Sequence, residues 1–354
     1  SIRARKWIDS HTVLEAIGLL PMKLLITTIA VLWTSPLAVW ADDQAAARLG
    51  KAIDAGLKTV QKAAASYPEN RSCFSCHHQS LPMLAMVEAR TYGATIDSDL
   101  LQEQAVFTHD FYKERTEKVA KGEGVGGRSM TVAYSLWALD LAGRKPDQVS
   151  DALTDYLLKR QNEDGHWQLQ SHRPPLEESD AMTTFLAAYY MGRIAQKDRK
   201  AAVAKAVEKA TRWLAQSKEK SQEDSNAKLW ALAELGEDTA SDKVAGLRAK
   251  ILENQNDDGG WSQLPDMESD AYATGQTLFI LDETGLADSD PAVRRGVEFL
   301  LKSQKPDGSW LVETRSKPVQ KFFDNGDPHG KHQFISIAAT SWAIAALCRT
   351  ESDR

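Results

Sequence analysis

The residues with the clearest chemical signature form the string Cys73-Phe-Ser-Cys76-His77, which His78 follows directly. Cys-x-x-Cys-His is the attachment signature of a c-type haem, in which two thiols add to the haem vinyl groups and the imidazole becomes the proximal iron ligand. The pattern therefore predicts covalently bound haem c, held by Cys73, Cys76 and His77. A redox or ligand-activating role would then depend on the sixth iron ligand.

Three alternatives stay open for this segment. In an oxidising compartment Cys73 and Cys76 could form a short disulfide. They could instead join His77 or His78 on zinc, although a closed structural site needs four ligands and the chain has no second Cys-x-x-Cys. The segment could also simply line a pocket. Cys348, the third cysteine, falls late in an apolar segment and is expected to be a buried small residue.

Further candidate metal ligands lie elsewhere in the sequence. The longest predicted interruption between helices, residues 313–333, holds Pro328-His-Gly and Lys331-His-Gln. Long irregular loops of this kind often carry function, so the loop could supply a second ligand or a substrate contact, or it could just cover a helix end. The candidates for the position facing the haem are His78, Met83, His109, His329 and His332.

Two acidic segments of nearly the same sequence begin apolar helices. They are Glu178-Ser-Asp180-Ala and Glu268-Ser-Asp270-Ala, and Asp266 precedes the second. A carboxylic acid at a helix start that faces an apolar cavity retains its proton, because desolvation disfavours the ionised form. Asp270, Glu268, Asp266 and Asp180 are therefore candidate general acids. The alternative is helix N-capping, which the repetition at two equivalent positions favours.

A helical repeat must position these residues. Three copies of Gln-x-x-Asp-Gly-x-Trp end at tryptophans that are 94 and 49 residues apart, close to two periods and one period of a repeat. A degenerate copy around Trp213 fills the gap. Repeats of this length indicate helix pairs that bury their faces against neighbouring pairs. The three complete copies are 161–167, 255–261 and 304–310.

Each copy follows an amphipathic helix and precedes a more apolar one. The amphipathic helices are expected at 149–160, 243–254 and 292–303, and the apolar helices at 180–194, 270–282 and 336–347. Further helices are expected at 44–64, 81–91 and 100–119, in the two Leu-Trp-Ala-Leu phrases at Trp137 and Trp230, and before the degenerate copy at Trp213, which gives twelve helices. Apolar helices must be buried and amphipathic ones can coat them, so the prediction is an all-α (α/α)6 toroid, with an open solenoid as the alternative.

The Gln-x-x-Asp-Gly-x-Trp segments resemble the QW repeats of squalene–hopene cyclases and the related prenyltransferase/squalene-oxidase repeat, over residues 44–349. In those cyclases an inner helix begins with an Asp-x-Asp-Asp acid that starts polyene cyclisation. The stretch from Asp266 to Asp270 departs from that pattern, because the paired Asp-Asp is missing. The string Cys-x-Ser-Cys-His-His-Gln-x-Leu-Pro also resembles an exported, bacterial group of squalene-cyclase-like toroid proteins.

Composition and the N-terminus set further bounds. The 354 residues include 43 Lys+Arg and 49 Asp+Glu, a net charge of −6, which excludes a strongly basic nucleic-acid binder. Met22-Lys23, an apolar run and an Ala-x-x-Ala ending at Ala41 predict a signal peptide behind an upstream extension. Residues 42–354 are then one toroid domain, periplasmic or secreted, without a stable membrane span.

Three functional hypotheses follow from these patterns. The first is an exported haem-c toroid that acts on a hydrophobic, isoprenoid-like small molecule or exchanges electrons with a partner. The second is a terpenoid-cyclase-like enzyme that uses an acidic helix start as a general acid. The third is a non-catalytic toroid that binds a peptide, a glycan or a lipid.

Overall fold

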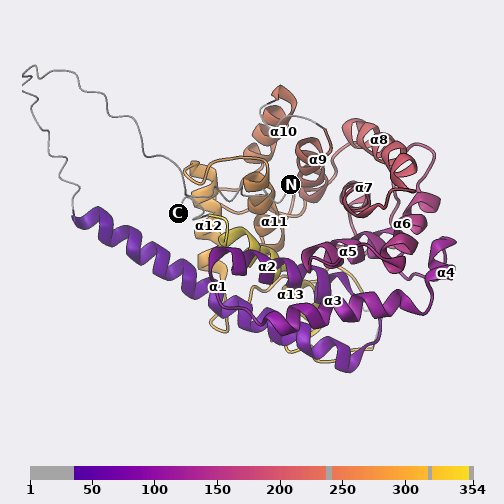
Figure 1. Cartoon of the computed structure of the whole chain (residues 1–354). Coiled ribbons are helices and arrows are strands. Elements are labelled where there is room, and N and C mark those ends of the chain that lie inside the picture. Colours follow the sequence, from indigo (N-terminus) through magenta and orange to yellow (C-terminus); the bar gives the residue numbers. More distant parts are fainter. Residues whose placement is uncertain (1–35, 237–240, 318–320, 351–354) are drawn as a thin grey trace, which may run out of the picture. The chain divides into compact units, whose positions relative to one another are not determined.

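The computed structural model describes residues 36–236, 241–317 and 321–350, with side chains from residue 44 onward (Figure 1). The predicted upstream extension and most of the predicted signal peptide fall in residues 1–35, outside this range. The unit that carries all candidate residues runs from Leu49 to Arg354. No helix in the described parts of the chain has the length and apolarity needed to cross a membrane.

Six helices of this unit pack side by side in an inner ring, and α13 returns to contact α2, which closes it. The inner helices are α2 (Leu81–Tyr92), α5 (Arg128–Leu141), α7 (Asp180–Ile194), α9 (Gln222–Leu235), α11 (Ala271–Glu283) and α13 (Gln333–Leu347). The outer helices are α1 (Pro36–Asn70), α3 (Ser98–Lys113), α6 (Gln148–Arg160), α8 (Lys200–Gln216), α10 (Asp242–Glu253) and α12 (Pro291–Ser303). This arrangement confirms the predicted (α/α)6 toroid over the open solenoid.

Burial follows the two kinds of helix that the sequence distinguishes. Every residue of α13 except Phe334 is buried, because this helix is apolar all round and lies inside. In the outer helix α8 the buried residues are Val203, Ala206, Ala210 and Leu214, a spacing of three or four that forms one stripe. The toroid core therefore lies between the two rings and inside the inner one.

The three complete Gln-x-x-Asp-Gly-x-Trp segments make the same contacts. Each glutamine donates from Nε2 to the carbonyl of the glycine in its own turn. The same Nε2 also donates to a carbonyl of the next outer helix, at 2.8 Å in each copy: Gln161 to Ala206, Gln255 to Ala292, and Gln304 to Ala52. The last of these contacts joins α12 to α1 and closes the outer ring.

The tryptophan of each segment ties the turn to the helix before it. The indole Nε1 donates at 2.8 Å to the carbonyl of Leu157, Ile251 or Leu300, near the end of α6, α10 or α12. Each of these carbonyls also accepts the backbone N–H of Gln161, Asn254 or Gln304, so the indole adds a second hydrogen bond at the end of the helix. All three indoles are buried. Gln and Trp thus have the structural role that the repeat pattern predicts.

The turn glycines face the next outer helix at close range. Gly165, Gly259 and Gly308 have φ values of +109°, +88° and +87°. A Cβ atom at these positions would lie 2.4, 2.6 and 2.5 Å from a backbone carbonyl oxygen of the neighbouring helix. Glycine is needed there both for the left-handed backbone and for the space.

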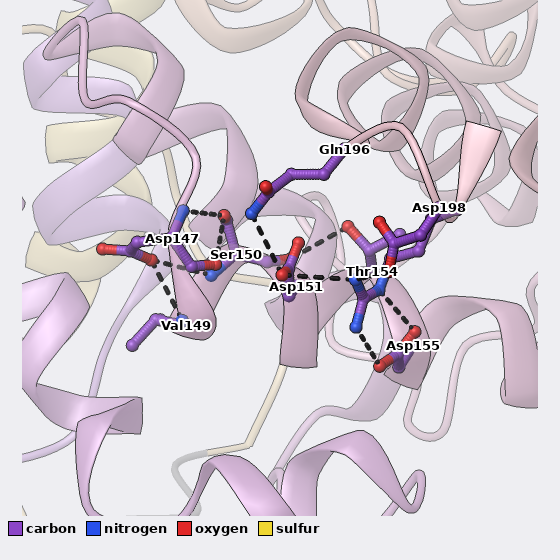
Figure 2. Close-up of polar contacts among 9 residues, drawn as sticks. Asp147, Val149, Ser150, Asp151, Thr154, Asp155, Gln196 and Asp198 are labelled. Carbon is purple, nitrogen blue, oxygen red and sulfur yellow. Dashed lines mark hydrogen bonds and ion pairs between the residues drawn. The ribbon is translucent and has the colours of Figure 1, made fainter.

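Side-chain contacts add to these backbone ties. Figure 2 shows the start of α6, where Asp147 and Ser150 form a capping box. One turn on, Asp151 accepts a hydrogen bond of 3.0 Å from Gln196 and pairs with Arg199 at 3.2 Å. These contacts hold the α7–α8 connection against α6.

Three predicted helices have clearly different bounds in the structure. The first, expected over 44–64, is longer at both ends, Pro36–Asn70. The helix expected over 100–119 is wrong as one element, because it breaks after Lys113 and continues as α4 (Thr116–Ala120). Arg115 Nε donates a hydrogen bond of 2.7 Å to the Phe111 carbonyl. In a continuous helix this carbonyl would accept the backbone N–H of Arg115 instead. The last helix begins at Gln333 instead of Ser336, behind a 3₁₀ turn, η2 (Gly330–His332).

The substitution Gly308→Ala should lower the free energy of unfolding by about 2 kcal/mol or more, because the methyl group needs a left-handed backbone and meets the Ala55 carbonyl. The matched control Gly246→Ala lies within α10 with nothing within 4 Å of its added Cβ. This control should stabilise the protein by about 0.5–1 kcal/mol. Chemical denaturation measures both changes, and a Gly308→Ala protein as stable as the parent would contradict the fit of this turn against α1.

Candidate functional site

The inner helices bring aromatic side chains together inside the ring. Trp137 of α5 lies 6.0 Å from Trp230 of α9 and 5.9 Å from Trp342 of α13, measured between ring centroids. Phe279 of α11 contacts both Trp230 and Trp342. These tryptophans come from the repeated Leu-Trp-Ala-Leu phrase and its echo Ser-Trp-Ala-Ile. The repeat therefore lines the ring interior with aromatic faces.

A buried carboxyl group lies among these inner helices. Glu223, in the first turn of α9, is 6% exposed. Its Oε1 atom accepts hydrogen bonds from the Tyr272 hydroxyl at 2.9 Å and from Gln276 Nε2 at 3.0 Å, both on α11. Both donors are neutral, so no cation compensates a charge on this carboxyl through these contacts.

Burial raises the pKa of Glu223 to about 8. The nearby carboxylates of Asp224 and Glu178 raise it further, whereas the hydrogen bonds from Gln276 and Tyr272 oppose the rise. The carboxyl is therefore protonated at neutral pH. Burial raises the pKa of the Tyr272 and Tyr134 hydroxyls and Glu223 adds to the rise, so both hydroxyls stay neutral.

The orientation of Gln276 is set by its own neighbour. Asn226 Nδ2 donates to Gln276 Oε1 at 3.0 Å, which leaves the Gln276 amide N–H pointing to Glu223. Gln222 Nε2 holds Asn226 in turn, at 3.0 Å. A chain of buried amides thus fixes which Glu223 oxygen accepts hydrogen bonds, and it leaves the other oxygen for the proton.

Two polar atoms in this region have no hydrogen-bond partner among the described residues: Glu223 Oε2 and the Tyr134 hydroxyl. Buried polar atoms without partners are rare, because each loses its hydrogen bonds to water. Their concentration around one protonated carboxyl marks the interior as a place where a ligand or a reacting group would meet them.

Asp270, the first acid candidate, lies at the start of α11 and caps it. Its Oδ1 accepts from the backbone N–H groups of Tyr272 and Ala273 at 2.8 and 2.9 Å, and its Oδ2 accepts from Gln263. Burial raises the pKa of Asp270 to about 6, and these hydrogen bonds oppose the rise. These contacts are those of a helix N-cap, the role that the sequence suggests as the alternative to a general acid.

The other acid candidates lie farther out. Asp266 and Glu268 are exposed in the connection before α11. Asp180 is the first residue of α7, and its Oδ1 accepts a hydrogen bond of 2.7 Å from the Leu169 backbone. Asp180 also lines a pocket of about 370 Å³ at the starts of α7 and α9, together with Glu178 and Asp224.

The Cys-x-x-Cys-His segment precedes α2, and its second half forms a short π-helix, η1 (Cys76–Ser80). Cys73 and Cys76 are both free thiols. Cys73 is half-buried, and its Sγ lies 3.4 Å from the Tyr67 hydroxyl. Cys76 is buried, and burial together with the Glu177 carboxylate raises the pKa of its thiol.

The two histidines of this segment differ. Burial lowers the pKa of His77 to about 3, and the Arg173 guanidinium adds to this, so the imidazole is neutral. The His77 ring packs against Phe334 and against the fully buried ring of His78. His78 Nε2 lies 2.7 Å from Asn325 Nδ2, so the C-terminal loop covers this segment.

The remaining candidate metal ligands, His329 and His332, hydrogen-bond to groups other than Cys73 and Cys76. His329 Nε2 hydrogen-bonds to Ser309 Oγ at 2.7 Å, and His332 Nδ1 accepts from the Thr314 backbone at 3.0 Å. Within the described ranges no three His, Cys, Asp or Glu side chains converge on one point as metal ligands would. Zinc binding stays a prediction from the sequence.

The chemistry of Cys73, Cys76 and His77 fits haem attachment, because two free thiols and a neutral imidazole are the groups it needs. The packing leaves little room, since only 7% of Cys76 is exposed. The side chains that cover η1 would have to move aside for a porphyrin. Haem c also stays a prediction from the sequence.

Comparison with known proteins supports the toroid. No family model matches the chain, and no curated protein matches it. The type II terpene cyclase MstE from Scytonema in complex with merosterolic acid A is 14% identical over 85% of this chain and 96% of that chain, with a TM-score of 0.55. A variant of the same cyclase with geranylgeranyl dihydroxybenzoate is 16% identical over 86% and 97%, also with a TM-score of 0.55.

A glycosidase variant has the same architecture. It is 12% identical over 86% of this chain and 97% of that chain, with a TM-score of 0.59. At such identities the likeness shows the fold alone, and this fold carries unrelated chemistries. The class of protein is thus the (α/α)6 toroid, and the chemistry has to be argued from the interior of this chain.

Sequence reasoning missed Glu223 and its partners. The available signal was the string Ser221-Gln-Glu223-Asp at the start of the inner helix α9. The two acidic segments that contain Asp180 and Asp270 stand at the starts of the inner helices α7 and α11. Its sequence differs from those of the two acidic segments. Nothing in it shows whether Glu223 or Asp224 points into the ring. Tyr134, Tyr272 and Gln276 come from two other helices, so only the closed ring brings them to Glu223.

Stability should depend on pH through Glu223. Its folded pKa of about 8 exceeds the ordinary 4.5, so its contribution to stability is complete below pH 4.5 and is lost as pH rises from there to about 8. Glu223→Gln keeps a neutral, hydrogen-bonding side chain and should become progressively more stable than the parent over this range. Urea denaturation at several pH values measures the difference. Exposed Glu268→Gln is the control, and a difference for Glu223→Gln that stays flat with pH would contradict the raised pKa.

The haem prediction is tested by intact mass and haem staining. Protein exported in a host with a cytochrome c maturation system should gain the mass of one haem, and Cys73→Ala should lose the thioether at that position. Cys348→Ala, which removes a buried thiol outside the motif, should keep the haem. An unmodified mass in the parent protein would contradict haem attachment.

Proposed function

We propose that this chain is an acid–base enzyme of the toroid class that protonates a carbon–carbon double bond of a hydrophobic, isoprenoid-like substrate, with Glu223 as the proton donor. The observation that carries the proposal is a carboxyl group buried inside the ring, with a pKa raised to about 8 by burial and one oxygen without a partner among the described atoms. Such a group holds a proton at neutral pH and can donate it only to something that enters the interior.

The surroundings suit the cation that protonation creates. The Tyr134, Tyr272 and Trp342 rings lie on three inner helices around Glu223, and Trp137 and Trp230 continue the aromatic interior. An aromatic face attracts a positive charge through its quadrupole, most strongly where water is excluded. The aromatic faces would therefore stabilise a carbocation in the interior.

The reaction balances within the protein and its substrate. The Oε2–H bond of Glu223 breaks as the π electrons of the double bond take the proton. The cation is attacked by a second double bond in the chain, and a C–H bond next to the new cation then loses its proton to water, which gives a cyclised isomer. A proton from water restores the Glu223 acid. Hydrogen bonds from Tyr272 and Gln276 to Oε1 stabilise the carboxylate that remains.

The structural neighbours support the substrate class. The terpene cyclase that shares this fold binds a geranylgeranyl substrate and a merosterolic acid product. This proposal keeps the acid-initiated chemistry predicted for a terpenoid-cyclase-like enzyme. It moves the acid from the helix-capping Asp270 to the inward-facing Glu223.

An exported haem protein with a redox role is the second candidate function. The observation that favours it is the neutral imidazole of His77 directly beside the Cys76 thiol. These residues would hold the haem with Cys73, and the haem would supply electron transfer or ligand binding. The two functions are separable, because the first depends on Glu223 and the second on Cys73.

Deuterium incorporation tests the proposed chemistry. Squalene and geranylgeraniol, incubated with the protein in D₂O, should yield an isomer that carries one new deuterium. Glu223→Gln should reduce this yield by about 10²-fold or more, because an amide cannot donate the proton. The yield should also fall as pH rises above about 8, when Glu223 ionises.

The matched control for this experiment is Glu268→Gln, an exposed carboxyl in the connection before α11, which should keep the parent yield. Mass spectrometry measures the product. A Glu223→Gln protein with the yield of the parent, or a parent protein that labels neither probe, would count against the proposal.

A further inference from the structure

A pocket of about 370 Å³ lies at the starts of α7 and α9, and two of its lining residues are neighbours of Glu223. Asp224, which lines it, is the next residue along α9 from Glu223. Glu178, which also lines it, lies close enough to Glu223 to raise the pKa of that group. The pocket therefore lies beside the proposed acid.

The pocket is lined by more acidic than basic groups. Glu178, Asp180 and Asp224 contribute three carboxylates, against the single lysine Lys220 and His172. Glu178 is already paired with Arg315, which does not line the pocket. An anionic ligand would thus meet like charge in excess, which costs binding energy and slows its approach.

The helix starts at this pocket do not offset that charge. Free N–H groups at a helix N-terminus attract anions, but here the side chains of Ser179 and Ser221 cap α7 and α9. Asp180 and Asp224 lie in the first turns and already complement the two helix dipoles. A phosphate group would have to displace or neutralise these acids.

The other lining groups suit hydroxyl groups. Gln168 and Gln170 are exposed amides that can each donate and accept, whereas the Ser171 hydroxyl already donates to Glu177 Oε2. Such groups hydrogen-bond an uncharged polar ligand in either direction. Leu264 gives the pocket an apolar side.

We propose that this pocket binds the uncharged, hydroxylated head of an amphipathic isoprenoid substrate and discriminates against a diphosphate head. The inference rests on the proposed function, since it assumes that the tail of the same molecule reaches Glu223. It adds the substrate class, an isoprenoid alcohol or a related neutral head, which the acid alone does not specify.

Binding to the full chain tests this preference without turnover. Equilibrium dialysis in the Glu223→Gln background compares geranylgeraniol with geranylgeranyl diphosphate, and cellobiose serves as a hydroxylated ligand without a tail. The alcohol should bind about tenfold more tightly than the diphosphate, or better, and the preference should weaken as salt rises. Diphosphate binding as tight as that of the alcohol would overturn the proposal, as would displacement of the alcohol by cellobiose at equal concentration.

A charge introduced into the pocket sharpens the test. Gln170→Lys adds a cation at an exposed lining position and should improve diphosphate binding by about tenfold, narrowing the preference. Gln216→Lys adds the same charge at an exposed position of α8 that does not line this pocket, and it should leave the preference unchanged. Equal effects of the two lysines would overturn the assignment of the pocket.

The two proposals fail in different ways. If the alcohol binds with the expected preference but D₂O labelling is absent, the pocket assignment stands and the acid chemistry does not. If labelling depends on Glu223 but the diphosphate binds as well as the alcohol, the acid stands and the head-group preference does not.

Discussion

The toroid depends on one repeated hydrogen bond, the donation from a turn glutamine to a carbonyl of the next outer helix. The amide has two N–H groups and uses them on both sides of the boundary, one for its own turn and one for the neighbour. The glycine in the same turn removes the Cβ that would keep the helices apart. Because the contact is directional, it sets how each helix pair meets the next, and its last copy links Gln304 to Ala52.

Closure has a chemical consequence inside the ring. Side chains on α5, α9, α11 and α13 converge only because α13 returns to α2, and water is then excluded from the space they share. In that setting a carboxyl such as Glu223 keeps its proton, since no cation offsets the cost of burying its charge. The same exclusion strengthens the effect of the aromatic faces on any positive charge that forms there. The ring architecture and the proposed acid chemistry are therefore linked by desolvation.

The C-terminal loop connects the two chemical regions. Asn325 contacts His78, and Phe323 and Phe334 pack around the His77–His78 pair. Farther along the loop, Arg315 pairs with Glu178 and also donates to Gln263, which in turn bonds to Asp270. The longest interruption in the helical pattern thus covers the cysteine segment and borders the pocket. The second ligand or substrate contact that the sequence suggested for this loop stays a prediction.

Local patterns in the chain determined much of the fold. The spacing of Gln161, Gln255 and Gln304, with an Asp-Gly turn and a tryptophan after each, was enough to predict helix pairs, their order and a toroid. Such features are local, because turn chemistry and helix amphipathicity depend on residues close together in sequence. The helix break near Arg115 was not predicted, because it depends on the Arg115 side chain, which hydrogen-bonds to the Phe111 backbone carbonyl. The sequence also contained the Cys73–His77 motif, whose haem is still a prediction.

Only the tertiary structure decided which acid faces the interior. Asp180, Asp270 and Glu223 all lie at the starts of inner helices, and the sequence pattern singled out only the first two as caps or acids. Asp270 turns to the backbone of its own helix, whereas Glu223 turns to Tyr272 and Gln276 on another helix. That difference comes from which helices become neighbours when the ring closes, and from the burial that follows. Proton affinity depends on this long-range environment, so no local pattern could have revealed it.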